Sequence, residues 1–449
     1  MVDVRPFRGL RYDQGQVSDL ALVLCPPYDV ISPQKQADLY NRSQVNMVRL
    51  EFGQELPQDS PIDNRYTRAA ATLEGWLHNG ILRTEDRAAL YLHQHHFLYR
   101  GLPLRRQGLI ACVRMEEWQK GMVRPHEATA TRPKEDRMRL MRACHTNFSP
   151  IFALYDDPKM AVTSVLEECL RQPAVVDVDM GGGEGHRLWA VTEPQAIASI
   201  ARALAPQQLY IADGHHRYET ALAYSDEQRA SQAWSADSAF NFTMMELVES
   251  RDPGLLVLAP HRVVRGIPQA LVDSLPRRLE EFFVLHGTTL DQADSQRHLQ
   301  ALLRRMESEM PEESLMAVLG LKPGWLHVIK ARQPSSWEHL LPPHRWAGYA
   351  RLGVAVLQFV VLDRLLSTED FRLEAGSNLD FVPDEIEALR RVRDGEYQMA
   401  FFLNPVRVEC LKAIADAQDR LPKKATYFYP KLPSGLVINR LLGELPPIA

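Results

Sequence analysis

The sequence predicts an α+β protein with mixed sheets, built from two domains. The chain has 449 residues, which is too many for one simple core. Apolar residues make up 45% and charged residues 24% of it, the balance of a globular protein. Stretches typical of strands alternate irregularly with stretches of helical periodicity, which favours mixed sheets. We expect one α+β domain over residues 1–265 and a second over residues 266–449.

In the first part of the chain, helices are expected where apolar residues recur every three to four positions, and strands where they alternate or form short runs. The helices expected on this basis span residues 65–79, before a terminating Gly80, and residues 134–143, 162–170 and 195–204. The expected strands span residues 22–30, which end at a stiff proline pair, and residues 90–99, 106–115, 149–154, 174–178, 187–191 and 209–212. The glycine-rich residues 181–185 lack the Lys-Ser/Thr pair of a phosphate loop and predict a hairpin turn.

After about residue 240 two further strands precede a region of polar helices and short strands. The strands expected here span residues 240–247, 255–258, 315–319, 325–329 and 398–403. The expected helices span residues 296–309, 351–366, 384–394 and 405–417. The apolar run at 352–366 is interrupted by polar residues and too short to span a bilayer, so it predicts a buried helix.

Charge and cysteine content restrict the classes of function. The net charge of -5 argues against nucleic acid or a membrane surface as partner and leaves room for a local basic pocket that binds a small molecule. The five cysteines are scattered without a CxxC pair, so neither a cysteine zinc site nor a disulfide framework is expected. Reduced thiols and the lack of an apolar leader predict a cytoplasmic protein. The oligomeric state is not indicated.

The most informative segment is residues 209–224, LYIADGHHRYETALAY. In its first residues, apolar side chains occupy alternate positions, as in a short buried strand. After Gly214, residues recur at helical spacing. The start of such a helix has free backbone N–H groups, and these groups and the helix dipole attract anions. Arg217 can bind a phosphate through two N–H groups, and Asp213 can hold Mg²⁺. The segment predicts a site for a phosphorylated ligand; an ordinary strand–turn–helix corner is the alternative.

Two other segments present reactive side chains in loop-like sequence. Tyr28 and Asp29 follow two prolines that fix the backbone, which suits substrate contact and equally a rigid turn in which Asp29 caps the next helix. Residues 124–137, RPHEATATRPKEDR, contain candidates for a general base and for phosphate neutralisation. An exposed charged loop is the more common fate of such a run. The base candidates are His126 and Glu127, and the phosphate candidates are Lys134 and Arg137.

Basic residues gather at two later positions. Arg262 lies at a strand end, beside a histidine. In residues 422–435, PKKATYFYPKLPSG, Lys424 and Lys431 are interleaved with Thr426 and two tyrosines, a pattern of nucleotide contact and equally of a solvated sheet edge. A run of three histidines at 93–96 places only two of them on one strand face, which gives little support for a metal site.

Seven of these segments together resemble a known family. From about residue 5 to 440 the chain is similar to the family catalogued as domain of unknown function 1015. The segment DGHHR also resembles the phosphate-binding corner of the ParB/sulfiredoxin superfamily, which includes free-serine kinases. The segments are PPYDVIS at 26–32, VRL at 48–50, HEATATRPKEDR at 126–137, NFSPIFALYDD at 147–157, IADGHHRYETAL at 211–222, APHR at 259–262 and FYPKLPSGLV at 428–437.

The resemblance implies a ParB/sulfiredoxin-like mixed-sheet core, followed by an α+β region that contributes to the same cleft. It implies a kinase for a small hydroxyl compound, free L-serine first, with Mg²⁺ and with ATP, ADP or pyrophosphate as donor. A non-catalytic nucleotide-binding regulator related to ParB partition proteins is the alternative. Ala425 replaces a hydroxyl residue of the family pattern, which leaves the donor and the substrate open. The residues implied to hold phosphate and metal are Asp213, Gly214, His215, His216 and Arg217, with Glu127 as base.

Overall fold

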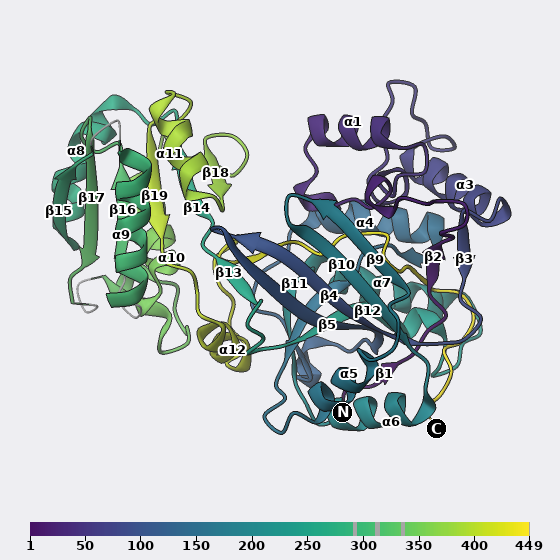
Figure 1. The fold of residues 1–449 in the computed structure, drawn as a ribbon. Coiled ribbons are helices and arrows are strands. Elements are labelled where there is room, and N and C mark those ends of the chain that lie inside the picture. Colours follow the sequence, from purple (N-terminus) through teal and green to yellow (C-terminus); the bar gives the residue numbers. More distant parts are fainter. Residues whose placement is uncertain (291–293, 310–314, 334–336, 449) are drawn as a thin grey trace. The chain divides into compact units, whose positions relative to one another are not determined.

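The computed structural model describes residues 1–290, 294–309, 315–333 and 337–448. The chain divides into two compact units (Figure 1). The first unit comprises Met1–Pro125, Thr129–Leu255 and Pro430–Ala449, and the second comprises His126–Ala128 and Leu256–Tyr429. This division differs from the expected boundary after residue 265. The C-terminal segment belongs to the first unit because its strand β21 (Asn439–Arg440) pairs with β7 (Thr146–Asn147).

The first unit is built on a large mixed sheet. Its strands follow the order β6-β11-β8-β12-β5-β4-β10-β9, and β1 also pairs with β5. The pairs β6–β11 and β8–β12 are parallel and the others are antiparallel. The bounds are β1 Val4–Arg5, β4 Leu90–Tyr99, β5 Leu102–Arg114, β6 Val123–Arg124, β8 Ile151–Tyr155, β9 Val176–Gly181, β10 Glu184–Val191, β11 Leu209–Asp213 and β12 Phe242–Glu249.

Side chains of this sheet alternate between two cores, as the two-residue period of a strand requires. On β5, Ile110 and Cys112 join one core, while Leu109 and Ala111 join the other. The expected strand pair at residues 90–115 and the hairpin turn between β9 and β10 are both present. Two short strands, β2 (Leu10–Tyr12) and β3 (Leu82–Thr84), pair beside the first core.

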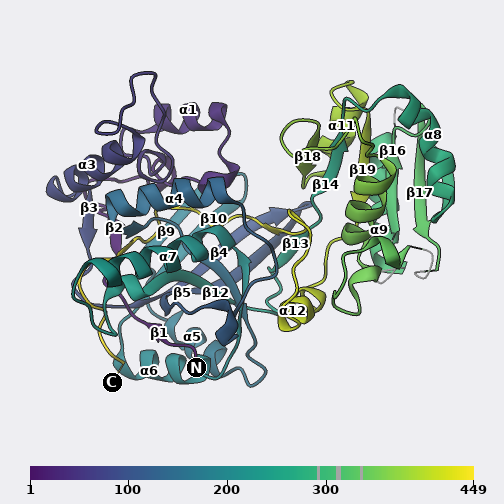
Figure 2. The ribbon, with the colours of Figure 1, turned by 180° about the vertical axis from the view of Figure 1, so that it is seen from behind.

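Helices cover both faces of the sheet. The first core includes residues of α1 (Pro33–Arg42), α2 (Val48–Glu51) and α3 (Arg65–His78). The second includes residues of α5 (Ala161–Cys169), α6 (Pro194–Leu204) and α7 (His215–Ser231). Helix α4 (Thr131–Cys144) lies alongside α7 (Figure 2) and contributes to both cores. The 3-10 helices are η1 Leu20–Leu22, η2 Tyr28–Val30, η3 Trp118–Lys120 and η4 Ala239–Asn241.

The second unit contains a sheet of order β15-β17-β16-β19-β14-β18, with all described neighbours antiparallel. One face packs against α8 (Gln269–Glu280) and a long buried helix made of α10 (Gly353–Val356) and the π-helical η8 (Leu357–Leu365). The other face packs against α9 (Ser295–Glu309) and α11 (Glu385–Arg393). The remaining bounds are β13 Leu256–Leu258, β14 His261–Val264, β15 Phe283–Thr289, β16 Leu315–Leu319, β17 Trp325–Ala331, β18 Leu379–Val382, β19 Met399–Leu403, β20 Tyr427–Tyr429, α12 Val408–Asp416, η6 Glu338–Leu340 and η7 Tyr349–Arg351.

The buried helix expected over residues 351–366 is therefore present, in α10 and η8. None of the described helices is both long and apolar enough to cross a bilayer. The two units are each α+β with a mixed or antiparallel sheet, as the sequence predicts.

Candidate functional site

The strand, turn and helix expected around Gly214 are present. Strand β11 is buried, pairs with β6 and β8, and ends at Asp213. Gly214 follows with φ of 95°, in the left-handed region that favours glycine. Helix α7 begins directly afterwards, and its N-cap residue, Gly214, has no side chain that could cap the first N–H groups. These donors are the groups that make a helix start attractive to anions.

Asp213 is held between two cations. Its Oδ2 atom accepts a hydrogen bond from Arg217 Nη2 at 2.5 Å, and Oδ1 pairs with Lys431 Nζ. Lys431 Nζ also lies 3.8 Å from the carboxylate of Asp29. Burial alone would raise the pKa of Asp213, but Lys431 and Arg217 outweigh that effect and hold the pKa well below its usual value. The Asp213 carboxylate thus stays ionised at neutral pH within a small network of paired charges.

The Arg217 side chain folds back over Gly214. Its Nη1 atom donates to the Pro150 carbonyl at 2.5 Å. A Cβ atom on Gly214 would lie only 3.0–3.1 Å from the guanidinium group. The glycine therefore provides both the left-handed turn and the room for the arginine. The arginine, in turn, lies directly over the start of α7.

A second layer of charged residues lies behind Arg217. Glu51, at the end of α2, is buried and forms an ion pair of 3.5 Å with Arg137. Burial raises the pKa of Glu51, and the charges of Arg137 and Arg217 oppose that rise. Arg137 stacks on Tyr28 with 4.0 Å between its Cζ atom and the ring centroid, and burial raises the pKa of Tyr28 to about 12. A cavity of about 40 Å³ is lined by Glu51, Arg137 and Arg217 among others.

The cavity has room for about one or two water molecules. Small-molecule sites usually measure about 300–1,000 Å³, so a ligand at the corner has to displace side chains or widen this space.

Glu51 was missed by sequence reasoning. The available signal was a single acidic residue at the end of the apolar run NMVRLEF.

Three other predicted residues of the first unit have structural contacts. Lys134 Nζ pairs with Glu219 at 2.9 Å, so its charge is already neutralised. His216 Nε2 accepts a hydrogen bond from the backbone N–H of Ala130 at 2.8 Å, which ties α7 to the segment before α4. His215 is buried at the first position of α7. For these three residues, a role in phosphate binding remains a prediction.

In the second unit, four predicted residues from distant parts of the sequence meet. His126 Nε2 lies 3.0 Å from Thr426 Oγ1, and the His126 carbonyl accepts from the Leu421 N–H at 2.8 Å. The carboxylate of Glu127 accepts a hydrogen bond from the backbone N–H of Lys424. The HE pair and the KKAT segment are therefore neighbours, as a shared role requires.

Arg262 belongs to the same unit and is fully buried on β14. Its Nη1 atom donates to the Pro260 carbonyl, and its Cζ atom lies 5.1 Å from the centre of the Phe381 ring. Burial lowers the pKa of Arg262 to about 10, and the negative charge of Glu127 opposes that effect. Asp213 and Glu127 belong to different units, so their expected common cleft stays a prediction.

The family assignment follows from a match to a sequence profile. The profile described as Protein of unknown function (DUF1015) matches residues 4–352, more than half of the chain. The chain belongs to this family. The resemblance to this family noted in the sequence is thereby confirmed.

No curated protein matches the chain. Solved structures show faint similarity. A free serine kinase in complex with ADP has a TM-score of 0.34 at 10% identity, over 72% of this chain and 87% of its own. A conserved hypothetical protein from Pyrococcus furiosus has a TM-score of 0.33 at 12% identity, over 74% and 95%. SbnI from Staphylococcus aureus, with its C-terminus truncated, has a TM-score of 0.30 at 9% identity, over 72% and 84%. Similarities of this size carry no argument about function.

Proposed function

We propose that this member of the family is a phosphotransferase that moves a phosphoryl group from ATP, ADP or pyrophosphate to the hydroxyl of a small compound, with free L-serine as the first candidate. The observation that supports it most is the start of α7 at Gly214 beside Arg217 and Lys431. Phosphoryl transfer depends mainly on positioning and on neutralising the charge of the transferred group. Backbone N–H groups and two fixed cations at one corner suit that task.

Arg217 retains donors for such a ligand. A guanidinium group has five N–H donors, and the hydrogen bonds to Asp213 and Pro150 occupy two of them. Asp213 orients Arg217 and Lys431, so that both cations are in place before a phosphate arrives. In this proposal Asp213 is a positioning residue, and Arg217 and Lys431 contact the phosphate.

Asp213 fits poorly as the ligand of Mg²⁺ that the sequence predicts. Both of its carboxylate oxygens already face cations, and a third cation at the same group would be repelled. No step is therefore derived through Mg²⁺, and the assay tests the metal by adding or withholding it.

The proton of the attacking hydroxyl requires an acceptor. Glu127 is the proposed base and His126 the second candidate. Both remain assignments from the sequence. Glu127→Gln keeps the size of the side chain and removes its basicity, so it should lower kcat about a hundredfold or more with a smaller effect on KM.

The test is a transfer assay. The purified chain is incubated with each donor, with and without Mg²⁺, and with L-serine, L-threonine or glycerol, and phosphorylated products are identified by mass spectrometry. Arg217→Ala should lower kcat/KM about a hundredfold or more. The matched control is Arg202→Ala, which removes an exposed arginine from α6.

Three outcomes are distinct. The proposal is supported if a phosphorylated product forms from a hydroxyl compound and its formation depends on Arg217. Tight nucleotide binding without product from any acceptor favours the non-catalytic regulator. Full activity in Arg217→Ala would remove the corner from the mechanism.

A further inference from the structure

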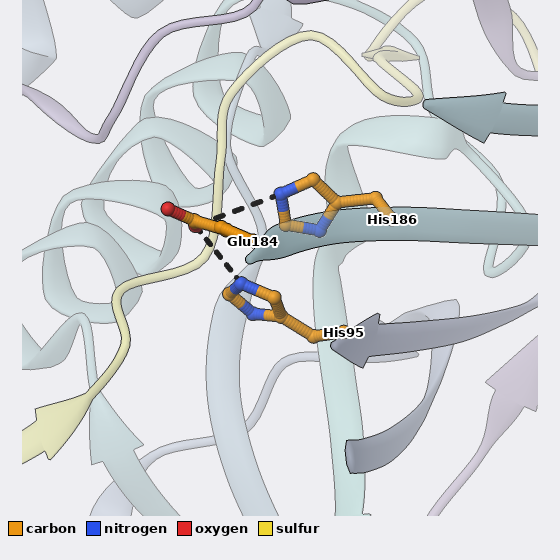
Figure 3. A group of neighbouring side chains, drawn as sticks. All are labelled: His95, Glu184 and His186. Carbon is orange, nitrogen blue, oxygen red and sulfur yellow. Dashed lines mark hydrogen bonds and ion pairs between the residues drawn. The ribbon is translucent and has the colours of Figure 1, made fainter. Parts of the chain in front are cut away.

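A second group of reactive side chains lies on the sheet of the first unit, apart from the Gly214 corner. His95 comes from β4, and Glu184 and His186 come from the neighbouring strand β10, with all three side chains converging (Figure 3). His95 and His186 are directly paired across the two strands and are almost fully buried. The potential ligand atoms of the three residues lie within 4.8 Å of one another.

The distances suit a single bound ion. His95 Nε2 lies 3.0 Å from Glu184 Oε1, and His186 Nε2 lies 3.8 Å from the same oxygen. In a tetrahedral zinc site with bonds of about 2.0–2.1 Å, two ligand atoms are separated by about 3.4 Å. Small side-chain rotations would bring the three atoms to that spacing.

His186 presents a lone pair into the cluster. Its Nδ1 atom lies 3.1 Å from His93 Nε2, and His93 Nδ1 lies 2.9 Å from Glu246 Oε1. A carboxylate only accepts hydrogen bonds, so Glu246 fixes the proton on His93 Nδ1, and His93 Nε2 then accepts from His186 Nδ1. In neutral His186 the remaining lone pair is on Nε2, the atom that faces Glu184.

That atom is buried and has no hydrogen-bond partner in the described structure. Burial lowers the pKa of both His95 and His186 well below the usual value, which keeps the imidazoles in the neutral form that binds metals. A carboxylate behind a ligating histidine is the common arrangement that fixes the tautomer at metal sites. Here Glu246 acts through His93.

A glycine makes this arrangement possible. Glu246 is on β12 and His93 is on β4, with β5 between them. Gly108 of β5 pairs with His93, and a Cβ atom at Gly108 would overlap the carboxylate of Glu246. The missing side chain lets Glu246 reach across the intervening strand.

We propose that His95 Nε2, His186 Nε2 and Glu184 Oε1 bind one divalent transition-metal ion of the Zn²⁺ class, with water completing its coordination. Two imidazoles and one carboxylate are a frequent donor set for such ions. Glu184 is partly exposed, so one of the three ligand side chains is open to solvent and to entering ions.

Arg106 is the main opposing feature. Its Nη2 atom lies 3.2 Å from His95 Nδ1 and donates to the Pro430 carbonyl at 2.9 Å. An arginine only donates, so without metal His95 accepts at Nδ1 and carries its proton on Nε2. Metal binding releases that proton or moves it to Nδ1, and it brings a second positive charge near the guanidinium. The site should therefore bind more weakly than one without Arg106.

The experiment is a Zn²⁺ titration of the tag-free, EDTA-treated full chain by calorimetry, with Co²⁺ absorption as a second readout. The wild type should bind one equivalent of Zn²⁺. When Co²⁺ takes its place, the protein should show a visible d–d absorption band. Glu184→Gln and His186→Ala should each weaken binding about a hundredfold, and Glu246→Gln about tenfold or more. The matched control, His96→Ala, removes the next histidine of β4, which points to the opposite face, and should bind as the wild type does.

Arg106→Met provides a test in which Zn²⁺ binding should become tighter. A folding defect would not produce that result. Removal of the neighbouring cation should lower the dissociation constant about tenfold or more. Equal Zn²⁺ affinity in the wild type and Glu184→Gln would overturn the proposal even if His186→Ala fails to fold. Loss of the bound equivalent of Zn²⁺ in His96→Ala would also overturn the proposal.

Discussion

Replacement of Asp213 by asparagine should destabilise the first unit. The variant keeps the shape of the side chain but leaves Arg217 and Lys431 facing each other without a negative charge between them. The Arg217 and Lys431 side chains are each only 11% exposed, so water screens them little. Loss of one partner of a buried ion pair costs about 3–5 kcal/mol. Asp213 retains some exposure, so we expect about 3 kcal/mol.

The assay is thermal unfolding of wild type, Asp213→Asn, Lys431→Met and the double variant. For a domain of this size about 3 kcal/mol corresponds to a fall in Tm of about 6–12 °C. In the double variant one of the two cations is also absent. Its destabilisation should therefore be smaller than the sum of the single effects by about 1 kcal/mol or more. An Asp213→Asn protein with the wild-type Tm, or strictly additive effects, would refute the ion-pair reasoning.

The contribution of Asp213 to the free energy of unfolding should change with pH in a definite direction. The pKa of Asp213 is lowered in the folded state, whereas an unfolded aspartate titrates near about 3.9. The carboxylate therefore stabilises the fold above about pH 4, and this contribution is lost as the pH falls toward the folded-state pKa. The difference in unfolding free energy between wild type and Asp213→Asn should shrink over that range.

Three further substitutions, with Gly75→Ala as a control, test the fold of the first unit. Gly214→Ala should cost about 1–2 kcal/mol in unfolding free energy, because φ is 95° and the new Cβ would press on Arg217; an unchanged urea midpoint would contradict this. Gly108→Ala should lower Tm, because its Cβ would overlap the Glu246 carboxylate, while Gly75→Ala in α3 has open space and should raise Tm slightly. Tyr218→Phe should cost about 1–3 kcal/mol in chemical denaturation, because the buried hydroxyl donates to the Glu116 carbonyl at 2.7 Å and accepts from its N–H at 2.9 Å.

Local features of the fold were predictable and long-range pairings were not. The turn at Gly214 and the hairpin of β4 and β5 follow from periodicity within a few residues. The contact of Lys431 with Asp213 joins residues 218 positions apart and leaves no local signature. In the proposed mechanism, that contact is the reason why Asp213 positions two cations, whereas the sequence predicts it as a metal ligand.

The metal-binding candidates show the same limit. The alternation of β4 correctly places His93 and His95 on one face, but the sequence does not reveal that β10 is the neighbouring strand. Glu184 lies within the glycine-rich residues 181–185, which by themselves predict only a hairpin turn, and His186 follows them. Strand register, set by the whole sheet, decides which side chains meet.

The discontinuity of the first unit has a consequence for biosynthesis. Leu436, Val437 and Ile438 lie in the same core as Phe7, and Ile438 exchanges backbone hydrogen bonds with Leu10 at 2.8 and 3.0 Å. These residues leave the ribosome after the whole of the second unit. Synthesis of the first unit therefore begins before that of the second unit, but its core can be completed only afterwards. A nascent chain stalled before residue 430 would expose an unfinished apolar surface to chaperones.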